Sequence, residues 1–155
     1  MQHIGTQTIE TARLVLRKFS FADTESVWRN FAGDEQVQND YGEPENCIGM
    51  VAYFLVDTHN QFCEIEYCIG KQFQNKGYIS EAVKAITDYA FDKVGFNRVQ
   101  VSCRSVNIPS KRVIEKCEFT YEGTLRQFFN HLGQFQDRMY YSLLREEWEN
   151  GTQRH

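Results

Sequence analysis

The sequence has little that would suit a membrane, a nucleic acid or a structural metal ion. It contains no long apolar run, so we expect no transmembrane helix and no membrane partner. Its formal net charge is −4, which argues against general nucleic-acid binding. Five cysteines without a Cys-x-x-Cys pair, together with four scattered histidines, argue against a zinc site, and we predict no bound metal.

We also expect no secretory leader at the amino terminus. The segment MQHIGTQTIETARLVLRKF lacks a basic stretch followed by an apolar core, which a signal peptide would have. The cysteines are odd in number and irregularly spaced, a pattern typical of a reducing compartment. These observations predict a cytoplasmic location.

The sequence does contain enough apolar material for one packed core. Of its 155 residues, 41% are hydrophobic and 14% are aromatic, which is too many for a disordered chain. It has only two prolines and no repeat, linker or low-complexity tract. We therefore expect a single domain over residues 1–155.

Strand-like and helix-like segments in mixed order predict an α/β fold with a mixed sheet. Strands are expected where β-forming residues gather, and helices where apolar residues recur every three or four positions. The first helix should begin at Ser20, with Asp23 in a capping-box position. The expected strands are residues 13–18, 47–57, 62–69, 98–106, 121–129 and 135–143, and the expected helices are residues 20–32, 80–94 and 109–117.

The stretch QNKGYISEA, residues 74–82, places Gly77 between an expected strand and an expected helix. Glycine suits positions with unusual dihedrals or close approach to the main chain, and the amides at a helix start attract anions. An ordinary strand–helix connection is the alternative interpretation. Residues 71–116 carry nine Lys or Arg and four Asp or Glu, which indicates either a small anionic ligand or chance clustering of surface charge.

Three segments in this order resemble the GNAT superfamily of N-acetyltransferases: EIEYCIGKQFQNKGYISEAVKAITDYAFDKVGFNRVQV, VNIPSKRVIEKCEF and YEGTLRQ. The sequence looks closest to the branch that includes ribosomal-protein N-terminal acetyltransferases, whose first strand and helix are similar to ETARLVLRKFSFAD. The resemblance covers most of the chain. It implies a GNAT-like acyltransferase fold, enzymatic acetyl transfer, and acetyl-CoA (coenzyme A) as the cofactor.

The resemblance assigns the loop around Gly77 to the pyrophosphate of acetyl-CoA. The family pattern of Gln or Arg, two residues, Gly, one residue, then Gly or Ala maps onto Gln74, Gly77 and Ile79. Asn75 stands where glycine is frequent, and Ile79 stands where Gly or Ala is expected. Main-chain amides of a turn and a helix start would supply the donors. The predicted cofactor-binding residues are Cys68, Ile69, Gln74, Asn75, Lys76, Gly77, Tyr78, Ile79, Ser80, Asn107, Ser110 and Arg112.

Several of these residues allow two interpretations. Ser80 would add a hydroxyl donor, whereas Lys76 and Arg112 either assist the phosphates or are plain surface charges. Asn107 matches a family residue that hydrogen-bonds the cofactor arm, but it equally suits a cap for the helix that follows. The resemblance further implies that main-chain amides near Cys68 meet the thioester and the pantetheine arm.

Glu64 is the predicted general base, because it stands where the histone-acetyltransferase branch has its base in the pattern E-I-x-x-C-x. Glu66 is the second catalytic candidate. It lies two residues on and therefore on the same face of a strand. Two neighbouring carboxylates would make each other stronger bases. The alternative is that both glutamates simply face solvent.

Three departures from the family pattern bear on activity. Ile114 stands where many relatives carry a tyrosine that protonates the thiolate, which leaves Ser110, Tyr121 or water for that step. Glu118 stands where the helix usually ends in glycine, so we expect a left-handed residue there at a cost of about 1 kcal/mol. Residues 33–46 are too few for the family's second helix and next strand, which predicts a shortened amino-terminal half. The shortening would widen the acceptor cleft, leave it to a partner subunit, or abolish catalysis.

The resulting prediction is an N-acetyltransferase that moves an acetyl group from acetyl-CoA to a primary amine, either a protein N-terminus or a small molecule. The alternative is a catalytically impaired CoA- or acyl-CoA-binding module of the same fold. An unrelated nucleotide-phosphate binder is disfavoured, because neither GxxxxGK[ST] nor GxGxxG occurs. The acceptor and a homodimer stay open. Phe128, Phe129 and Phe135 are interpreted as hairpin core, with an acceptor cleft or a dimer interface as alternatives.

Overall fold

The computed structural model describes residues 7–32 and 47–152. The described chain forms two compact units that are interleaved in the sequence. Unit 1 contains residues 53–66 and 87–152, and unit 2 contains residues 7–32, 47–52 and 67–86. The expected single domain over residues 1–155 stays a prediction.

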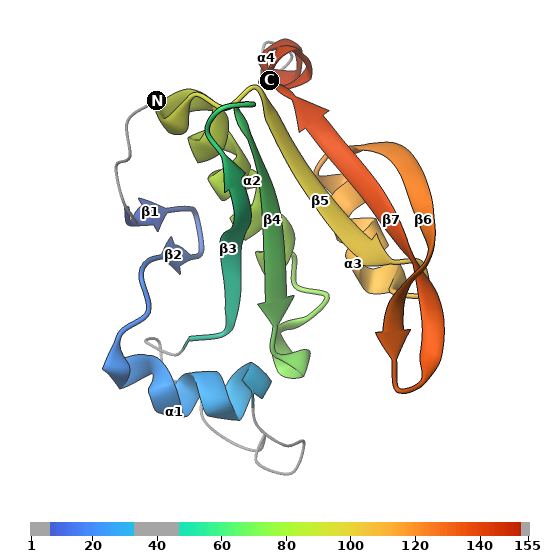
Figure 1. The fold of residues 1–155 in the computed structure, drawn as a ribbon. Coiled ribbons are helices and arrows are strands. Elements are labelled where there is room, and N and C mark those ends of the chain that lie inside the picture. Colours follow the sequence, from blue (N-terminus) through green and yellow to red (C-terminus); the bar gives the residue numbers. More distant parts are fainter. Residues whose placement is uncertain (1–6, 33–46, 153–155) are drawn as a thin grey trace. The chain divides into compact units, whose positions relative to one another are not determined.

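Unit 1 is built on a mixed sheet with the strand order β3-β4-β5-β7-β6. β4 runs parallel to β5, with Phe62 opposite Arg98 and Ile65 opposite Val101. β7 is antiparallel to both β5 and β6. In Figure 1, β6 and β7 form one long twisted hairpin, and α3 lies against β5. The strands are β3 (Gly49–Asp57), β4 (Phe62–Ile69), β5 (Arg98–Arg104), β6 (Thr120–His131) and β7 (Gln134–Leu144), of which unit 1 holds β3 from residue 53 and β4 to residue 66.

The core of unit 1 follows from the period of two along β5. Its residues alternate between half-buried and buried, and Val99, Val101 and Cys103 point into the core. Helix α3 (Ile108–Lys116) adds Ile114, which is 1% exposed. Helix α4 (Arg145–Thr152) follows β7, and the turn η5 (Ala90–Val94) continues the preceding helix α2.

Unit 2 contains a small antiparallel pair, a short helical segment and the start of α2. β1 (Ile9–Glu10) pairs with β2 (Val15–Leu16). Asp23 accepts hydrogen bonds from the amide of Ser20 at 2.6 Å and from its hydroxyl at 3.0 Å, which confirms the expected helix start. The helical elements are η1 (Phe21–Asp23), α1 (Thr24–Val27), η2 (Trp28–Ala32), η4 (Lys71–Phe73) and α2 (Tyr78–Tyr89). Only the part of α2 up to residue 86 belongs to unit 2.

Most expected elements are present, with a few corrections. The predicted α/β fold with a mixed sheet is confirmed. The strand expected over residues 13–18 shrinks to Val15–Leu16, because the chain first turns through hydrogen bonds between Thr11 and Leu14. The pair partner β1 and the final helix α4 were not expected. Glu118 has a φ of 66°, which confirms the expected left-handed helix end. The expected short connection at residues 33–46 lies outside the described residues.

Candidate functional site

The loop before α2 has the conformation of an anion-binding helix start. Asn75 and Gly77 both have positive φ, at 60° and 83°. The first helical hydrogen bond runs from the Glu81 amide to the Gly77 carbonyl at 3.1 Å. The first amides of an α-helix have no acceptor within the helix itself, and a helix start of this kind attracts anions. Gln74, Asn75 and Lys76 are exposed beside it.

Two of the sequence departures have a local explanation in this loop. Asn75, which replaces a frequent glycine, holds a left-handed conformation that asparagine tolerates better than most residues. Ile79 is half-buried. Ser80, whose hydroxyl was predicted to add a donor, is only 8% exposed.

Arg13 is the residue of this site that the sequence interpretation missed. Its Nη1 donates to the carbonyl of Lys76 at 3.0 Å, and its guanidinium lies 4.9 Å from the ring centre of Tyr78. A Cβ added at Gly77 would stand 3.3 Å from Nη2 of Arg13. A fixed positive charge thus lies against the same loop, and it is 63 residues away from Lys76 in the sequence.

Glu81 in the first turn of α2 fixes Arg13 in place. Its carboxylate pairs with Arg13 at 2.6 Å and also accepts from the Arg13 amide at 2.9 Å. Thr11 donates its hydroxyl to the same carboxylate at 2.6 Å. These contacts hold the pKa of Glu81 below its usual value, with the Thr11 hydrogen bond as the largest cause.

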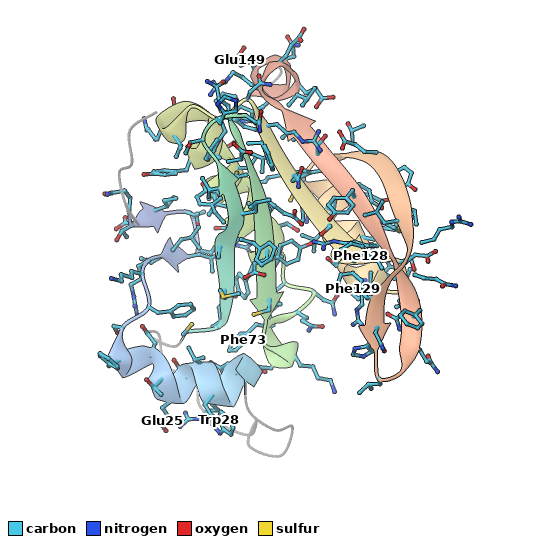
Figure 2. The ribbon with its side chains drawn as sticks, viewed as in Figure 1. Glu25, Trp28, Phe73, Phe128, Phe129 and Glu149 are labelled. Atoms are coloured by element: carbon cyan, nitrogen blue, oxygen red, sulfur yellow. The ribbon has the colours of Figure 1, made fainter. Side chains whose placement is uncertain are left out.

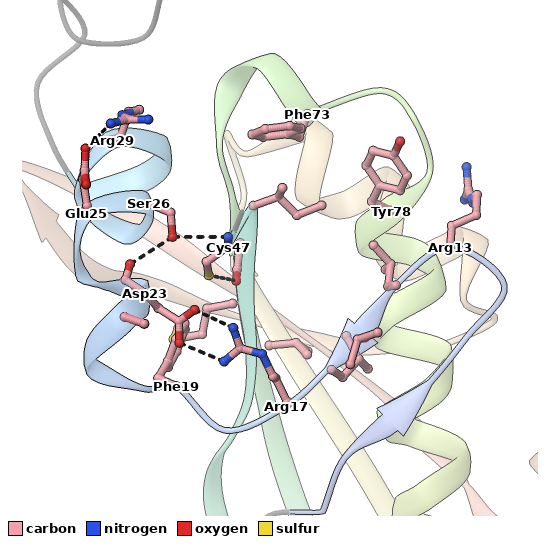
Figure 3. Close-up of a pocket in the computed structure, with 18 residues that line it drawn as sticks. Arg13, Arg17, Phe19, Asp23, Glu25, Ser26, Arg29, Cys47, Phe73 and Tyr78 are labelled. Atoms are coloured by element: carbon pink, nitrogen blue, oxygen red, sulfur yellow. Dashed lines mark hydrogen bonds and ion pairs between the residues drawn. The ribbon is translucent and has the colours of Figure 1, made fainter. Parts of the chain in front are cut away.

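Unit 2 also contains a pocket of about 910 Å³, which is shown in Figure 3. Arg13 and Tyr78 lie at the end next to α2, and Arg17 and Asp23 lie at the end below α1. Two hydrogen bonds from Arg17, at 2.6 and 2.8 Å, are the main reason why the pKa of Asp23 is well below its usual range. The volume is in the range of small-molecule sites, and the pocket borders the loop through Arg13 and Tyr78.

Glu64 lies in unit 1, where three donors surround its carboxylate. Glu64 is 5% exposed. Its Oε2 accepts from Gln100 at 2.9 Å, and its Oε1 accepts from Ser102 at 2.8 Å and from Arg138 at 2.7 Å. The strand pairing that aligns Glu64 with Gln100 brings these side chains together. Hydrogen bonds from three donors give this carboxylate a fixed orientation.

Glu66 differs from Glu64 in every one of these respects. It is exposed, and it makes no hydrogen bond or ion pair with the described residues. The expectation of two mutually interacting carboxylates is therefore wrong, because the charged partner of Glu64 is Arg138. The alternative that both glutamates face solvent is wrong for Glu64 and holds for Glu66. The role of each in catalysis stays a prediction.

The remaining predicted cofactor residues are divided between the units. Asn107, Ser110 and Arg112 lie at the start of α3 in unit 1, where Asn107 Oδ1 accepts from the Ser110 amide at 3.2 Å. The capping role of Asn107 is thereby confirmed, and a cofactor contact stays a prediction. Cys68 and Ile69 are half-buried at the end of β4 in unit 2.

The aromatic cluster of the hairpin is also different from the expectation. Phe128 and Phe129 lie next to each other (Figure 2), and their ring centres are 5.3 Å apart. Both rings contact the guanidinium of Arg138 instead of forming an apolar core. Phe135 is 64% exposed, so the hairpin-core interpretation is wrong for this residue.

Comparisons with family models, with sequences and with solved structures all indicate the same family. The model of the acetyltransferase (GNAT) domain matches residues 40–120. The chain is 29% identical to the uncharacterized N-acetyltransferase YnaD of Bacillus subtilis, over 90% of this chain and 98% of that protein. It is 28% identical to the ribosomal-protein-serine acetyltransferase of Escherichia coli over 54% of this chain and 46% of that protein. It is 25% identical to the spermidine N(1)-acetyltransferase of Vibrio cholerae over 70% and 63%.

Solved structures agree with these sequence relatives. A GNAT-family acetyltransferase from Bacillus anthracis matches with a TM-score of 0.75 and 25% identity, over 91% of this chain and all of that one. The self-immunity acetyltransferase MccE, solved in complex with acetyl-CoA and AMP, matches with a TM-score of 0.60 and 27% identity, over 64% and 55%. The chain spans only 55% and 60% of two further Bacillus relatives.

Two further features of the described residues bear on partners. None of the helices in the described ranges is both long and apolar enough to cross a membrane. No cluster of three or more metal-ligating side chains occurs in residues 7–32 and 47–152.

Proposed function

The chain belongs to the GNAT family of acetyltransferases, and on that premise we propose that it transfers an acetyl group from acetyl-CoA to a primary amine. The proposed acceptor is a protein N-terminus or a small amine. Two relatives are named for a ribosomal-protein serine and for spermidine, which supports a protein or a small-amine acceptor. The chain is an N-acetyltransferase by family, and the cofactor and acceptor are the parts that we propose for it.

The loop and helix start at residues 74–80 carry this proposal. A diphosphate needs several N–H donors at close range, and the amides of residues 77–80 are of this kind. Positive φ at Asn75 and Gly77 shapes the loop, and the guanidinium of Arg13, paired with Glu81, lies against it. The donor set thus suits the pyrophosphate of coenzyme A.

When bound, acetyl-CoA would supply an activated acyl group as a thioester. Transfer forms a bond from nitrogen to the acetyl carbon and breaks the bond from that carbon to sulfur, so the attacking amine must lose a proton. Glu64 is proposed to accept that proton through water. Its three donors hold the carboxylate in a fixed orientation. Glu66 is the second candidate, because it is exposed and makes no competing hydrogen bond with the described residues.

Two observations favour a second candidate function, a module that binds CoA without catalysis. Both carboxylate oxygens of Glu64 already accept hydrogen bonds from protein groups. Ile114, at the position where many relatives have a tyrosine, is buried and carries no proton to donate. Under this alternative, acetyl-CoA binds and is not consumed.

Calorimetry and a thiol-release assay with the whole chain test the proposal. We expect micromolar or tighter binding of acetyl-CoA, and release of free thiol with spermidine or with a peptide that begins with serine. Mass spectrometry of the acceptor should show one added acetyl group. Binding without thiol release on any amine would select the module, and absence of binding would exclude both functions.

A further inference from the structure

Glu64 and Arg138 form a buried ion pair that a serine bridges. Arg138 Nη2 donates to Glu64 Oε1 at 2.7 Å, and the side chains of Arg138 and Glu64 are 15% and 7% exposed. Ser102 donates to the same oxygen at 2.8 Å and accepts from Nε of Arg138 at 2.8 Å. The guanidinium therefore contacts the carboxylate both directly and through one hydroxyl.

Three aromatic rings surround the guanidinium of Arg138, and we call Phe128, Phe129 and Tyr140 the aromatic cage. The guanidinium carbon lies 4.9 Å, 5.3 Å and 4.8 Å from the three ring centres, in that order. Aromatic faces attract a cation, and the attraction grows where water is excluded. The cage therefore restrains the guanidinium on the sides that Ser102 and Glu64 leave open.

A bulge in β6 makes the cage. Leu125 pairs with Arg138 and Phe129 pairs with Gln136. The four residues that β6 advances between these pairs are therefore matched by only two residues on β7. Gln127 has a φ of 52°, and its amide donates to the Asp137 carboxylate at 2.8 Å. Consecutive strand residues normally point to opposite faces, but the bulge lets Phe128 and Phe129 contact one guanidinium.

The charged groups around Glu64 are few, which makes the effect of Arg138 separable. From β5, the neutral side chains of Gln100 and Ser102 contact Glu64. Gln100 in turn accepts from Arg98, and Arg98 pairs with Glu122 at 2.5 Å, so this second cation is offset by its own anion. Among the described residues, Arg138 is the one cation with a hydrogen bond to Glu64.

We propose that Arg138 is a positioning residue for Glu64 in acetyl transfer, and that the aromatic cage holds it in place. This inference rests on the proposed function of Glu64 as the base. The ion pair with Arg138 fixes where the carboxylate of Glu64 lies. Its planar fork engages Ser102 and Glu64 together, which directs the remaining lone pairs of the carboxylate.

The test compares Arg138→Met, Arg138→Lys and the matched control Arg126→Met, an exposed arginine on β6. With a saturating amine that the wild type acetylates, Arg138→Met should lower kcat about tenfold or more. KM for acetyl-CoA should stay unchanged.

Arg138→Lys separates charge from shape. It keeps the positive charge and loses the planar fork, so its kcat should fall several-fold, less than in Arg138→Met, with KM unchanged. Arg126→Met should match the wild type throughout. All variants act on the same amine, so its protonation affects them equally. A difference in kcat between variants therefore arises from the protein.

An active wild type with an unchanged kcat in Arg138→Met would overturn the inference and leave the proposed function standing. No acetyl transfer by the wild type, on any amine, would instead end the proposed function and this inference with it. Should Arg138→Met not fold, Phe128→Leu provides the test, because it loosens the cage and leaves the ion pair intact. A lowered kcat with unchanged KM supports the inference, and an unchanged kcat overturns it.

Discussion

Arg13 and Glu81 form an ion pair at 2.6 Å on the first turn of α2, directly against the loop proposed to hold the pyrophosphate. Nη1 of Arg13 also donates to the carbonyl of Lys76. The guanidinium is therefore held by Glu81 of α2 on one side and by the loop on the other. Neither residue belongs to the family pattern that located the loop. The first prediction concerns the effect of Arg13 on the binding of acetyl-CoA.

Arg13→Met should weaken acetyl-CoA binding about tenfold, because a hydrogen bond to a charged group contributes roughly 1.5–3 kcal/mol and each 1.4 kcal/mol is a factor of ten. Calorimetry measures the change. Arg126→Met, which removes an equally exposed arginine elsewhere, is the control. An unchanged affinity in Arg13→Met would show that the Arg13 cation does not act on the phosphates.

Gly77 and Gly95 provide a matched pair for the loop. Their φ values are 83° and 86°, so alanine should cost about 1 kcal/mol of folding stability at either position. Only at Gly77 does an added Cβ approach another group, the Arg13 guanidinium at 3.3 Å, whereas at Gly95 nothing lies within 4 Å. Gly77→Ala should weaken acetyl-CoA binding roughly five-fold or more, since a displaced loop misdirects its amides.

Gly95→Ala should have a similarly lowered unfolding midpoint and an unchanged affinity for acetyl-CoA. Thermal unfolding and calorimetry on the same samples make the comparison. If both variants bound acetyl-CoA equally well, the loop at residues 74–80 would not be the phosphate site.

Glu64 and Glu66 provide a matched pair of variants for identifying the general base. Glu64→Gln should lower kcat by a factor of roughly 10² to 10⁴ and leave acetyl-CoA affinity nearly intact, because it removes the base and not the cofactor loop. Glu66→Gln, on an exposed side chain two residues away, should stay within a few-fold of the wild type. The reverse order of the two effects would assign the base to Glu66.

Glu64→Gln also leaves the guanidinium of Arg138 without its ion pair, so this variant should be less stable than the wild type. Rates must therefore be compared well below its unfolding midpoint. A variant that is folded, binds acetyl-CoA and turns over at the wild-type rate would remove Glu64 from the mechanism.

The sequence predicted the elements whose signal is local. The strands around residues 62–69 and 98–104 follow from β-forming residues. The left-handed conformation of Glu118 was predicted from its position, at which the family's helix usually ends in glycine. Asn75 and Gly77 were located by a motif whose parts lie within a few residues. In each case the determining interactions are short-range, so one stretch of sequence contains them.

The parts that were missed depend on partners far apart in the sequence. Arg138 is 74 residues from Glu64, and nothing near Glu64 indicates that its partner is a cation instead of Glu66. Helix α4, REEWENGT, is too polar to show an apolar stripe. It is anchored by Trp148, which donates to Asp88 at 2.7 Å and packs on Phe91 at 5.3 Å. Such contacts appear only once the chain is folded.

The pair Arg98–Glu122 predicts how stability should depend on pH. The hydrogen bond from Arg98 is the main reason why the pKa of Glu122 falls to about 2, from an ordinary value of 4.5. The folded state therefore binds fewer protons than the unfolded state between these values. The stabilisation from this group is complete above about pH 4.5 and is lost as the pH falls toward 2.

Urea unfolding at pH 6, 4 and 3 can isolate this contribution with Glu122→Gln. At pH 6 the variant should be less stable than the wild type, because Arg98 has lost its partner, and the difference should shrink as the pH falls. Glu146→Gln, an exposed glutamate at the start of α4, should show a small difference that does not change with pH. The side chain of Glu122 is 40% exposed, so added salt should also reduce the difference at pH 6. A gap between the wild type and Glu122→Gln that stayed constant from pH 6 to pH 3 would mean that the carboxylate of Glu122 is not held ionised by Arg98.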